Sequence, residues 1–405
     1  MATLRSRTTS DLISELPEDV KHRILECLDT REAAKTSILS TQWNDVWLRH
    51  GQLFFDKVLL GEGEGVKCSK MITNALILRS GPVKKFTLDT SKWEPALQQC
   101  DLDLWCRFLS RNGIEQLNLF VDALTNTGDK YTLPVCIISC PTIKKLQLYF
   151  IDIRLPDNPR PGSMFSGVTS LEFNCVEFYR DNSPTVIHLL AHLEVLVFLD
   201  CHYIDNFLIS APSLNYLNFI DTQIVAEWKW FELHFRVIKT LCFCAYTFLY
   251  NIPAAINMQE RLPIAKNLQV IELHDFSFAH TNCFTLVIHL LRKCPKLCEL
   301  EIIMITPDVS NRSGEADPCI LRDPDGWFSD QDLSELRTVK MISFSGLRQE
   351  MLFIKLILSK APFLQEVLIS ESAGIDTSVT LEVQREMTSF PHASPKAKVV
   401  FVDPS

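Results

Sequence analysis

The hexapeptide IEQLNL, residues 114–119, carries the apolar pattern that decides the fold of this chain. An apolar residue is followed by two variable residues, an apolar residue, one variable residue and a last apolar residue. This phrase occurs eleven times in 405 residues, mostly at intervals of 21 to 31. The copies begin at residues 83, 114, 143, 168, 193, 214, 238, 268, 297, 336 and 364. Such a period indicates an array of stacked structural repeats.

The spacing within each phrase predicts a short β-strand. Side chains alternate between the two faces of a strand, so the last two apolar residues of a phrase are expected on the buried face. One unit cannot bury its strand alone, and the units must therefore stack into one extended domain. The exposed residues of the phrases are the candidate target-binding surface. They include Gln116, Asn118, Lys145, Gln147, Glu172, Asn218, Glu272 and Glu301.

The segments between the phrases contain turn signals and helical patterns. A proline stands two residues before four of the phrases, at Pro141, Pro212, Pro295 and Pro362. Each proline is expected to end a preceding helix and to extend the chain for the next strand. Apolar runs at 284–294 and 350–361 predict helices of an outer layer. A stretch rich in Asp, Pro, Gly and Ser at about 305–332 predicts an acidic loop, either a binding element or a disordered insertion.

The first fifty residues follow a helical pattern instead. Leu16, Val20, Ile24 and Leu28 recur every four residues and predict one apolar stripe on a helix. Pro17 suits the first turn of that helix, where a backbone N–H has no partner to lose. Such a small unit buries little surface by itself. Its apolar residues must therefore be covered by the rest of the chain or by a partner.

Two further helices are expected after the first. The spacing of Asp29 and Glu32 is that of a capping box and predicts a helix through about residue 39. Ser40 is suited to cap a third helix, which carries Trp43 and Trp47 at helical spacing.

The stretch LPEDVKHRILECLDTREAAKTSILSTQWNDVW, residues 16–47, resembles an F-box. The Leu-Pro start, the Ile-Leu pair before a third leucine, the acidic turn and the Leu-Ser-x-x-Trp ending carry the resemblance. Leu39 and Gln42 depart from the family pattern, which has Val and a basic residue at these positions. The order and spacing of the whole set make the resemblance specific.

The F-box resemblance implies docking on a Skp-type adaptor, which joins a cullin and a RING subunit to form an SCF ubiquitin ligase. Trp47 could instead pack against the next domain, and the alternative for the whole unit is a helical cap that only seals the repeat array. The residues that match the family's adaptor face are Leu16, Pro17, Val20, Ile24, Leu25, Leu28, Ser40 and Trp43.

Two further resemblances cover the remainder. The repeated phrase resembles the strand signature of leucine-rich repeats, in a divergent form. Residues 333–372, with a strand, a turn at Gly346, an apolar helix and the run APFLQEVLI, are similar to the FBD region of plant proteins. The chain as a whole thus resembles the plant F-box/FBD/LRR-repeat family. This implies a substrate-recognition subunit of a ubiquitin ligase; the alternatives are a receptor assisted by a small molecule within such a ligase, and a repeat scaffold outside any ligase.

The expected fold is mixed α/β, an α+β arrangement with an N-terminal three-helix F-box, a leucine-rich-repeat solenoid and a C-terminal FBD region. The expected divisions are a flexible tail at 1–9, the F-box at 10–56, and a linker with a connecting helix at 57–82. The repeats follow at 83–326, and the FBD region with a terminal strand that closes the array occupies 327–405.

The charge, the apolar runs and the cysteines of the chain argue against some classes of function and favour one kind of compartment. A net charge of −9 argues against general affinity for nucleic acid or anionic membranes, and no apolar run is long enough for a spanning helix. The 14 cysteines are scattered singly, many within apolar runs, which favours reduced thiols and a cytoplasmic or nuclear protein.

The sequence contains no recognisable catalytic constellation. His188 and His192 are four residues apart but lack the glutamate of a zinc protease between them, so they are interpreted as ordinary helix histidines. The pairs Cys136/Cys140 and Cys294/Cys298 have three residues between them rather than two, which favours core packing. We therefore expect no catalytic residue, no metal site and no cofactor.

Overall fold

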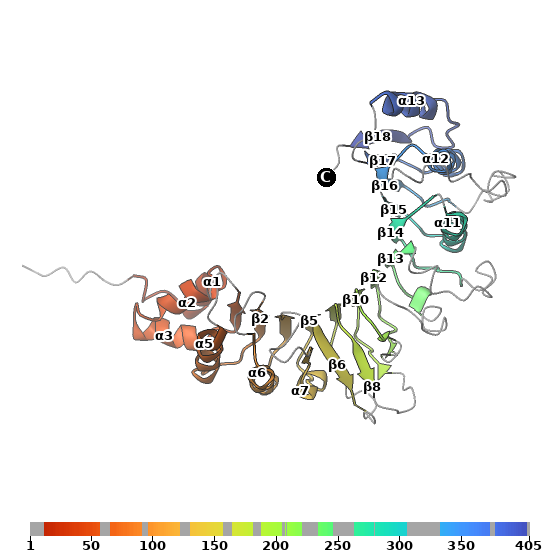
Figure 1. The fold of residues 1–405 in the computed structure, drawn as a ribbon. Coiled ribbons are helices and arrows are strands. Elements are labelled where there is room, and N and C mark those ends of the chain that lie inside the picture. The colour runs from red at the N-terminus through yellow and green to blue at the C-terminus, as the bar shows by residue number, and fades with distance from the viewer. Residues whose placement is uncertain are drawn as a thin grey trace, which may run out of the picture. The chain divides into compact units, whose positions relative to one another are not determined.

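The computed structural model of the chain describes residues 12–56, 65–90, 96–121, 130–156, 164–180, 188–204, 207, 209–220, 234–245, 263–278, 280–305, 333–372 and 377–402. The fold is mixed α/β, as the sequence indicates (Figure 1). Two compact units divide the chain. Unit 1 is Met1–Thr169 with Tyr179–Asp181, and unit 2 is Ser170–Phe178 with Asn182–Ser405.

Unit 1 begins with three short helices whose starts follow from local capping. Helix α1 (Glu18–Glu26) begins directly after Pro17. The side chain of Asp29 accepts a hydrogen bond from the Glu32 amide at 2.8 Å and caps α2 (Thr30–Thr36). Ser40 Oγ accepts from the Trp43 amide at 3.3 Å and caps α3 (Thr41–Arg49). Both predicted caps are confirmed, whereas α2 ends three residues earlier than predicted because residues 37–39 form a turn.

Parallel strands follow the helices in unit 1. Strand β1 (Gln52–Phe55) pairs with β2 (Lys85–Asp89), which pairs with β3 (Gln116–Phe120), which pairs with β5 (Lys145–Tyr149). Helices α5 (Gly65–Ile77), α6 (Gln99–Arg111) and α7 (Val135–Ile138) connect these strands along one side of the sheet, and β4 (Tyr131–Thr132) pairs with β6 (Ile151–Leu155) (Figure 1).

Unit 2 continues the same parallel pattern. Its strands pair in the order β7, β10, β12, β13, β14, β15, β16, β17 and β18. Helices α11 (Thr281–Lys293) and α12 (Arg348–Lys360) lie along one side of the strands, and α13 (Thr377–Met387) precedes the last strand (Figure 1). The bounds of the strands after β6, in chain order, are β7 (Ser170–Asn174), β8 (Phe178–Arg180), β9 (His188–Leu189), β10 (Val195–Leu199), β11 (Ile209–Ser210), β12 (Tyr216–Ile220), β13 (Thr240–Cys244), β14 (Val270–Phe276), β15 (Glu299–Met304), β16 (Thr338–Phe344), β17 (Glu366–Glu371) and β18 (Lys398–Val402), and most of β8 belongs to unit 1.

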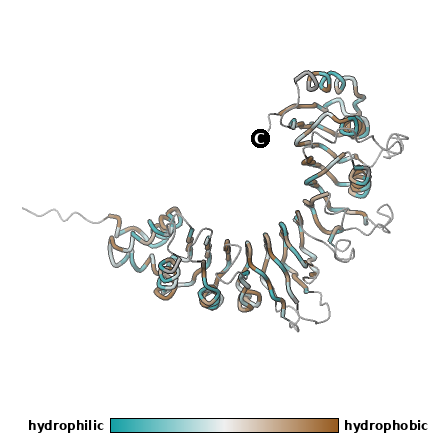
Figure 2. Tube along the Cα trace, in the orientation of Figure 1, coloured by the Kyte–Doolittle hydropathy of each residue, from teal (hydrophilic) through white to brown (hydrophobic). Residues whose placement is uncertain are grey.

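Each of the eleven phrases forms a strand that begins at its third residue. The apolar residues of neighbouring phrases align in register, as Leu117 does with Leu146 and Leu196 with Leu217, and all four are buried. Figure 2 shows hydrophobic and hydrophilic residues alternating along the strands. The core of each unit therefore lies between its strands and the helices or loops on the apolar side, which leaves the opposite face of the strands for function.

Tight turns end several strands. Phe150, Cys175 and Asp200 directly follow β5, β7 and β10 and adopt the left-handed backbone conformation. The amides of Cys175 and Asp200 donate to the next strand, to Leu199 O at 2.9 Å and to Ile220 O at 3.0 Å. The predicted turn at Gly346 is confirmed, with φ at 74°.

Some expectations are corrected and others lie outside the described residues. Pro141, Pro295 and Pro362 follow helices α7, α11 and α12 as predicted. Pro212 instead follows strand β11, because the short run before it is paired with β9. The acidic stretch lies outside the described residues except for Ile305. The predicted domain boundaries remain predictions, since the division into units falls within the repeats.

Within the described part of the chain, no helix combines the length and hydrophobicity needed to cross a bilayer. The cysteines that the structure describes form no disulfide bonds.

Candidate functional site

The helical segment 12–50 has its own small core. Trp43 is 1% exposed, and Leu25 and Val46 are also buried. Lys21 is buried as well, and its Nζ donates to Ser14 O at 2.6 Å and to Gln42 Oε1 at 2.9 Å. The same Nζ lies 5.8 Å from the centroid of the Trp43 ring. Gln42, which departs from the F-box pattern, thus supplies one of the two oxygens that accept hydrogen bonds from the buried Lys21 side chain.

Two of the residues expected on the adaptor face are buried in the helical segment. Leu25 and Trp43 pack inside the helical segment and not on its surface, because the inner face of α1 is formed by Lys21 and Leu25. Among the other expected members, Pro17 and Leu28 are exposed, and Leu16, Val20, Ile24 and Ser40 are half-buried.

Trp47 packs against the chain that follows, which was the alternative considered for it. The guanidinium carbon of Arg79, just after α5, lies 4.1 Å from the centroid of the Trp47 ring. Arg79 also donates to the Trp47 carbonyl oxygen. The Phe54 amide of β1 donates to Thr30 Oγ1 at 2.7 Å. The helices and the first strand are therefore joined, and the chain itself covers this side of the helical segment.

Four apolar side chains of the helical segment are not covered by the chain. Leu12 is 70% and Ile38 is 85% exposed, and Ile13 and Leu39 are also exposed. Ser14 Oγ donates to Ser40 Oγ at 3.0 Å, which brings the two segments together. We refer to Leu12, Ile13, Ile38 and Leu39 as the apolar patch. Sequence reasoning missed these residues because none falls on the four-residue stripe of the first helix.

The strand face of unit 1 presents polar side chains in register. Gln116 pairs with Lys145, and Asn118 pairs with Gln147 one column further along the strands. Lys145 is exposed and the three others are half-buried. Asn118 Nδ2 donates to Thr87 Oγ1 at 3.3 Å. The four residues expected in this unit thus lie together on the face opposite the helices.

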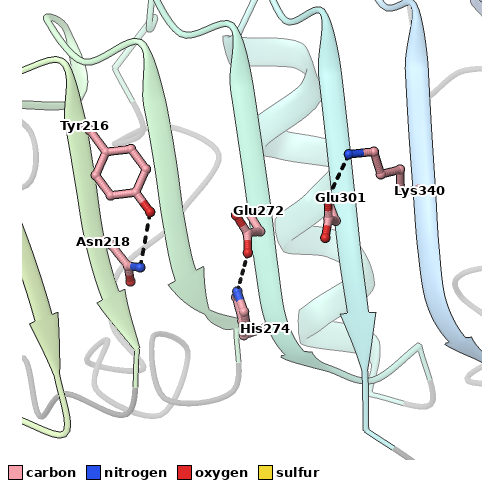
Figure 3. Close-up of polar contacts among 6 residues, drawn as sticks. All are labelled: Tyr216, Asn218, Glu272, His274, Glu301 and Lys340. Atoms are coloured by element: carbon pink, nitrogen blue, oxygen red, sulfur yellow. Dashed lines mark hydrogen bonds and ion pairs between the residues drawn. The ribbon is translucent and has the colours of Figure 1, made fainter. Parts of the chain in front are cut away.

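The strand face of unit 2 carries the other four expected residues. Glu172, Asn218, Glu272 and Glu301 occupy one column, in which β10 and β13 contribute Val197 and Cys242. Figure 3 shows Asn218, Glu272 and Glu301 on the same side of the sheet, with a helix behind the strands. The structure thus brings these residues into one surface, as the alternation predicts.

Polar partners that the sequence did not single out complete this surface. Lys340 Nζ lies 2.6 Å from Glu299 Oε1 and 3.2 Å from Glu301 Oε2. The hydrogen bond to Glu299 raises the pKa of Lys340 and keeps its ammonium charged. His274 Nε2 lies 2.7 Å from Glu272 Oε1, and Asn218 Nδ2 donates to the Tyr216 hydroxyl at 3.4 Å (Figure 3). The face can therefore offer both hydrogen-bond donors and carboxylates to a bound segment.

The structure places the histidine and cysteine pairs that were weighed as metal ligands from the sequence. His188 lies on strand β9 and not on a helix, so helical i,i+4 spacing to His192 is absent. Cys140 Sγ donates to Ser110 O at 3.7 Å, and Cys294 is buried, as expected for core packing. Burial raises the pKa of the Cys294 thiol.

A hollow of about 540 Å³ lies within unit 1, between the helical segment and the first strands. Most of its lining residues are of polar or charged types, and they include His22, Arg49, Lys84 and Glu115. Arg49 Nη1 is already paired with Glu18 Oε1 at 3.1 Å. The size suits a small ligand, but ligand sites are usually more apolar.

Comparison with known proteins agrees with this architecture. The family model of the F-box domain matches residues 13–54, which span the three helices and most of β1. The F-box/FBD/LRR-repeat protein At1g13570 of Arabidopsis thaliana is 28% identical over 97% of this chain and 98% of its own length. A second Arabidopsis F-box/FBD/LRR-repeat protein, At4g26340, is 23% identical over 96% of this chain and 100% of its own length. The probable FBD-associated F-box protein At1g32375 of the same plant is 22% identical over 96% and 100%.

These matches confirm the resemblance seen in the sequence. The repeat strands and the FBD-like segment with α12 and β17 are both included in the alignments, which cover nearly the whole chain. The chain therefore carries an F-box domain at its N-terminal end and is related over almost its full length to the F-box/FBD/LRR-repeat proteins of plants.

Proposed function

We propose that this protein is the substrate-recognition subunit of an SCF-type ubiquitin ligase. The F-box would bind a Skp-type adaptor, and through it a cullin and a RING subunit. The observation that carries the proposal is the apolar patch, because three of its four residues, Ile13, Ile38 and Leu39, fall within the F-box match. On this proposal the protein has no catalytic residues of its own and acts in the cytoplasm or nucleus.

The energetics favour a partner at the patch. Leaving four large apolar side chains in water forgoes roughly 2 kcal/mol each, or about 8 kcal/mol gross. Large apolar side chains that are exposed close together mark interaction sites. Much of the gross figure is spent on lost translational and rotational freedom. A complex therefore needs contacts beyond the patch, which the exposed Pro17 and Leu28 and the half-buried Val20 and Ile24 can provide.

For the rest of the chain, we propose that the strands and helices form a divergent leucine-rich-repeat solenoid and that its polar strand face binds the target. The parallel registers and the polar column from Glu172 to Glu301 support this role. Bound targets would be held close to the conjugating enzyme recruited by the RING subunit, which raises the effective concentration of their lysines.

The adaptor proposal can be tested with matched variants. Ile38→Ser/Leu39→Ser alters the patch, whereas Ile77→Ser/Leu78→Ser alters two equally exposed apolar residues outside the F-box match. Each protein is co-expressed with a Skp-type adaptor and analysed by size exclusion. We expect a one-to-one complex for wild type and the control pair, and its loss for the patch pair. A folded wild-type protein that elutes without the adaptor would overturn the proposal and favour a repeat scaffold.

A receptor assisted by a small molecule is the second candidate, and the polar hollow in unit 1 is the observation that favours it. Thermal stabilisation of the protein by a polar metabolite, lost in Lys84→Ala, would support it. The absence of any shift across a metabolite library would count against it.

A further inference from the structure

Three potential metal donors meet on strands β13 and β14 of unit 2. Cys242 and Glu272 are partners in the parallel register, and His274 is two residues beyond Glu272 on the same face. Cys242 Sγ, a Glu272 carboxylate oxygen and a His274 ring nitrogen all lie within 4.8 Å of one another. Glu272 Oε1 and His274 Nε2 are already 2.7 Å apart (Figure 3). Adjacent strands thus hold the three groups around one point.

The distances suit a metal ion after small side-chain adjustments. Tetrahedral Zn²⁺ has bonds of about 2.3 Å to sulfur and about 2.0–2.1 Å to nitrogen and oxygen, which places donor atoms roughly 3.3–3.6 Å apart. The present separations require the thiol to approach and the Glu272–His274 hydrogen bond to open. Both are rotations about side-chain bonds, because the backbone register already fixes the three Cα positions.

The donor types select a class of metal. A thiolate and an imidazole favour Zn²⁺ and similar transition ions, whereas Mg²⁺ and Ca²⁺ prefer oxygen donors. With three protein ligands, a fourth position is left for water, as in open zinc sites. The Cys242 side chain is buried, and Glu272 and His274 are only partly exposed, so the ion would be partly shielded from solvent.

The electrostatics of the surroundings also favour a cation. The carboxylates of Glu272 and Glu301 follow Cys242 in register on the next two strands, and Lys340 is engaged by Glu299 and Glu301 on the far side. On the near side Asn218, in register with Cys242, is 9% exposed, and its Oδ1 has no hydrogen-bond partner among the described residues.

We propose that Cys242, Glu272 and His274 form a binding site for a divalent transition-metal ion of the Zn²⁺ class. On binding, Cys242 releases its thiol proton, and His274 presents the Nε2 lone pair with its proton on Nδ1. The thiolate, the carboxylate, the neutral imidazole and the divalent ion then carry no net charge together. Occupancy would alter the charge of the strand face, and it can be measured whether or not the F-box binds an adaptor.

The test uses Co²⁺ as a spectroscopic probe with the full-length protein under reducing conditions, followed by displacement with Zn²⁺. We expect a thiolate-to-cobalt charge-transfer band that saturates at one equivalent. Affinity should increase with pH, because a thiol proton is released. Cys242→Ser should abolish the band, and His274→Gln should weaken binding at least tenfold. Cys298→Ser, which removes a partly exposed thiol of the same unit, is the matched control and should leave the band unchanged.

Three outcomes would overturn the proposal. The first is the absence of a charge-transfer band in the wild-type protein. The second is a band that persists in Cys242→Ser, which would place the metal on another thiol. Glu272→Gln should leave the fold intact, because its side chain lies on the polar face. The third outcome is an unchanged Zn²⁺ affinity in this variant, together with an unchanged unfolding midpoint.

Discussion

Replacing Trp43 by alanine should unfold the helical segment, because the structure places this side chain at its centre. Trp43 is 1% exposed and lies beneath the buried ammonium of Lys21. Truncating a buried tryptophan to alanine typically costs about 3–5 kcal/mol, since it removes the transfer free energy and leaves a cavity. A segment of this size cannot absorb such a loss easily. We therefore expect residues 18–49 to open at a much lower denaturant concentration than in the wild type.

A second substitution at the same position separates packing from hydrogen bonding. The indole Nε1 of Trp43 is buried and has no hydrogen-bond partner among the described residues. Trp43→Phe keeps most of the apolar volume and removes the unpaired donor, whose burial carries a cost of its own. Its cost should therefore stay below about 1.5 kcal/mol, near that of a volume-conserving change. Ile38→Ala, at an exposed position, should be nearly neutral.

The assay should report on the segment and not on the whole chain, because seven tryptophans contribute to the fluorescence. Hydrogen exchange of peptides from residues 18–49 across a urea series gives the local opening free energy directly. The expected order of destabilisation is Trp43→Ala, then Trp43→Phe, then Ile38→Ala. Equal protection of the segment in Trp43→Ala and in wild type would refute the assignment of Trp43 to the core.

Three further predictions concern burial and titration. Burial raises the pKa of Glu350 to about 7, so the stability of the wild type should fall as pH rises from 4.5 to 7. In urea denaturation, Glu350→Gln should therefore be about 1–3 kcal/mol more stable than wild type at pH 8 and no more stable at pH 5. Equal midpoints of variant and wild type at both pH values would count against this. Burial, with Arg79 nearby, lowers the pKa of His50 to about 4, so stability should also fall as pH drops from 6.5 to 4. His50→Gln should make that loss of stability smaller, and an unchanged pH dependence of stability between pH 6.5 and 4 would argue against it. Gly167→Ala would place a Cβ 2.5 Å from the Pro141 carbonyl oxygen and should cost about 1–3 kcal/mol in thermal unfolding, so an unaltered melting temperature would contradict the close approach.

The repeated phrase was sufficient to predict much of the fold. Period-two alternation combined with a fixed spacing requires strands at every copy, and the structure has them. β1 was not foreseen, because QLFF at 52–55 lacks the full phrase and becomes a strand only by pairing with β2. Short β9 was read as helix for a similar reason, since its pairing with β11 depends on residues 21 positions away.

The candidate sites were predictable to a lesser degree. Alternation placed Gln147 and Glu272 on the polar face, because a strand has only two faces. The helical stripe did not separate the inner from the outer surface of α1, since the buried position is held by Lys21, whose burial depends on oxygens from Ser14 and Gln42. Likewise the approach of His274 to Cys242 follows from strand register and leaves no local sequence signal.

Whether the F-box binds a Skp-type adaptor through the apolar patch is decided by the affinity of the purified adaptor for the full-length protein. Removing two apolar side chains from the patch in Ile38→Ser/Leu39→Ser should cost about 4 kcal/mol of binding, or roughly a thousandfold in Kd. The control Ile77→Ser/Leu78→Ser should bind within about threefold of wild type, and both variants should show the wild-type unfolding midpoint. Equal affinities for the two variants would rule out the patch as the adaptor site, and no measurable binding by the folded wild-type protein would rule out the adaptor as its partner.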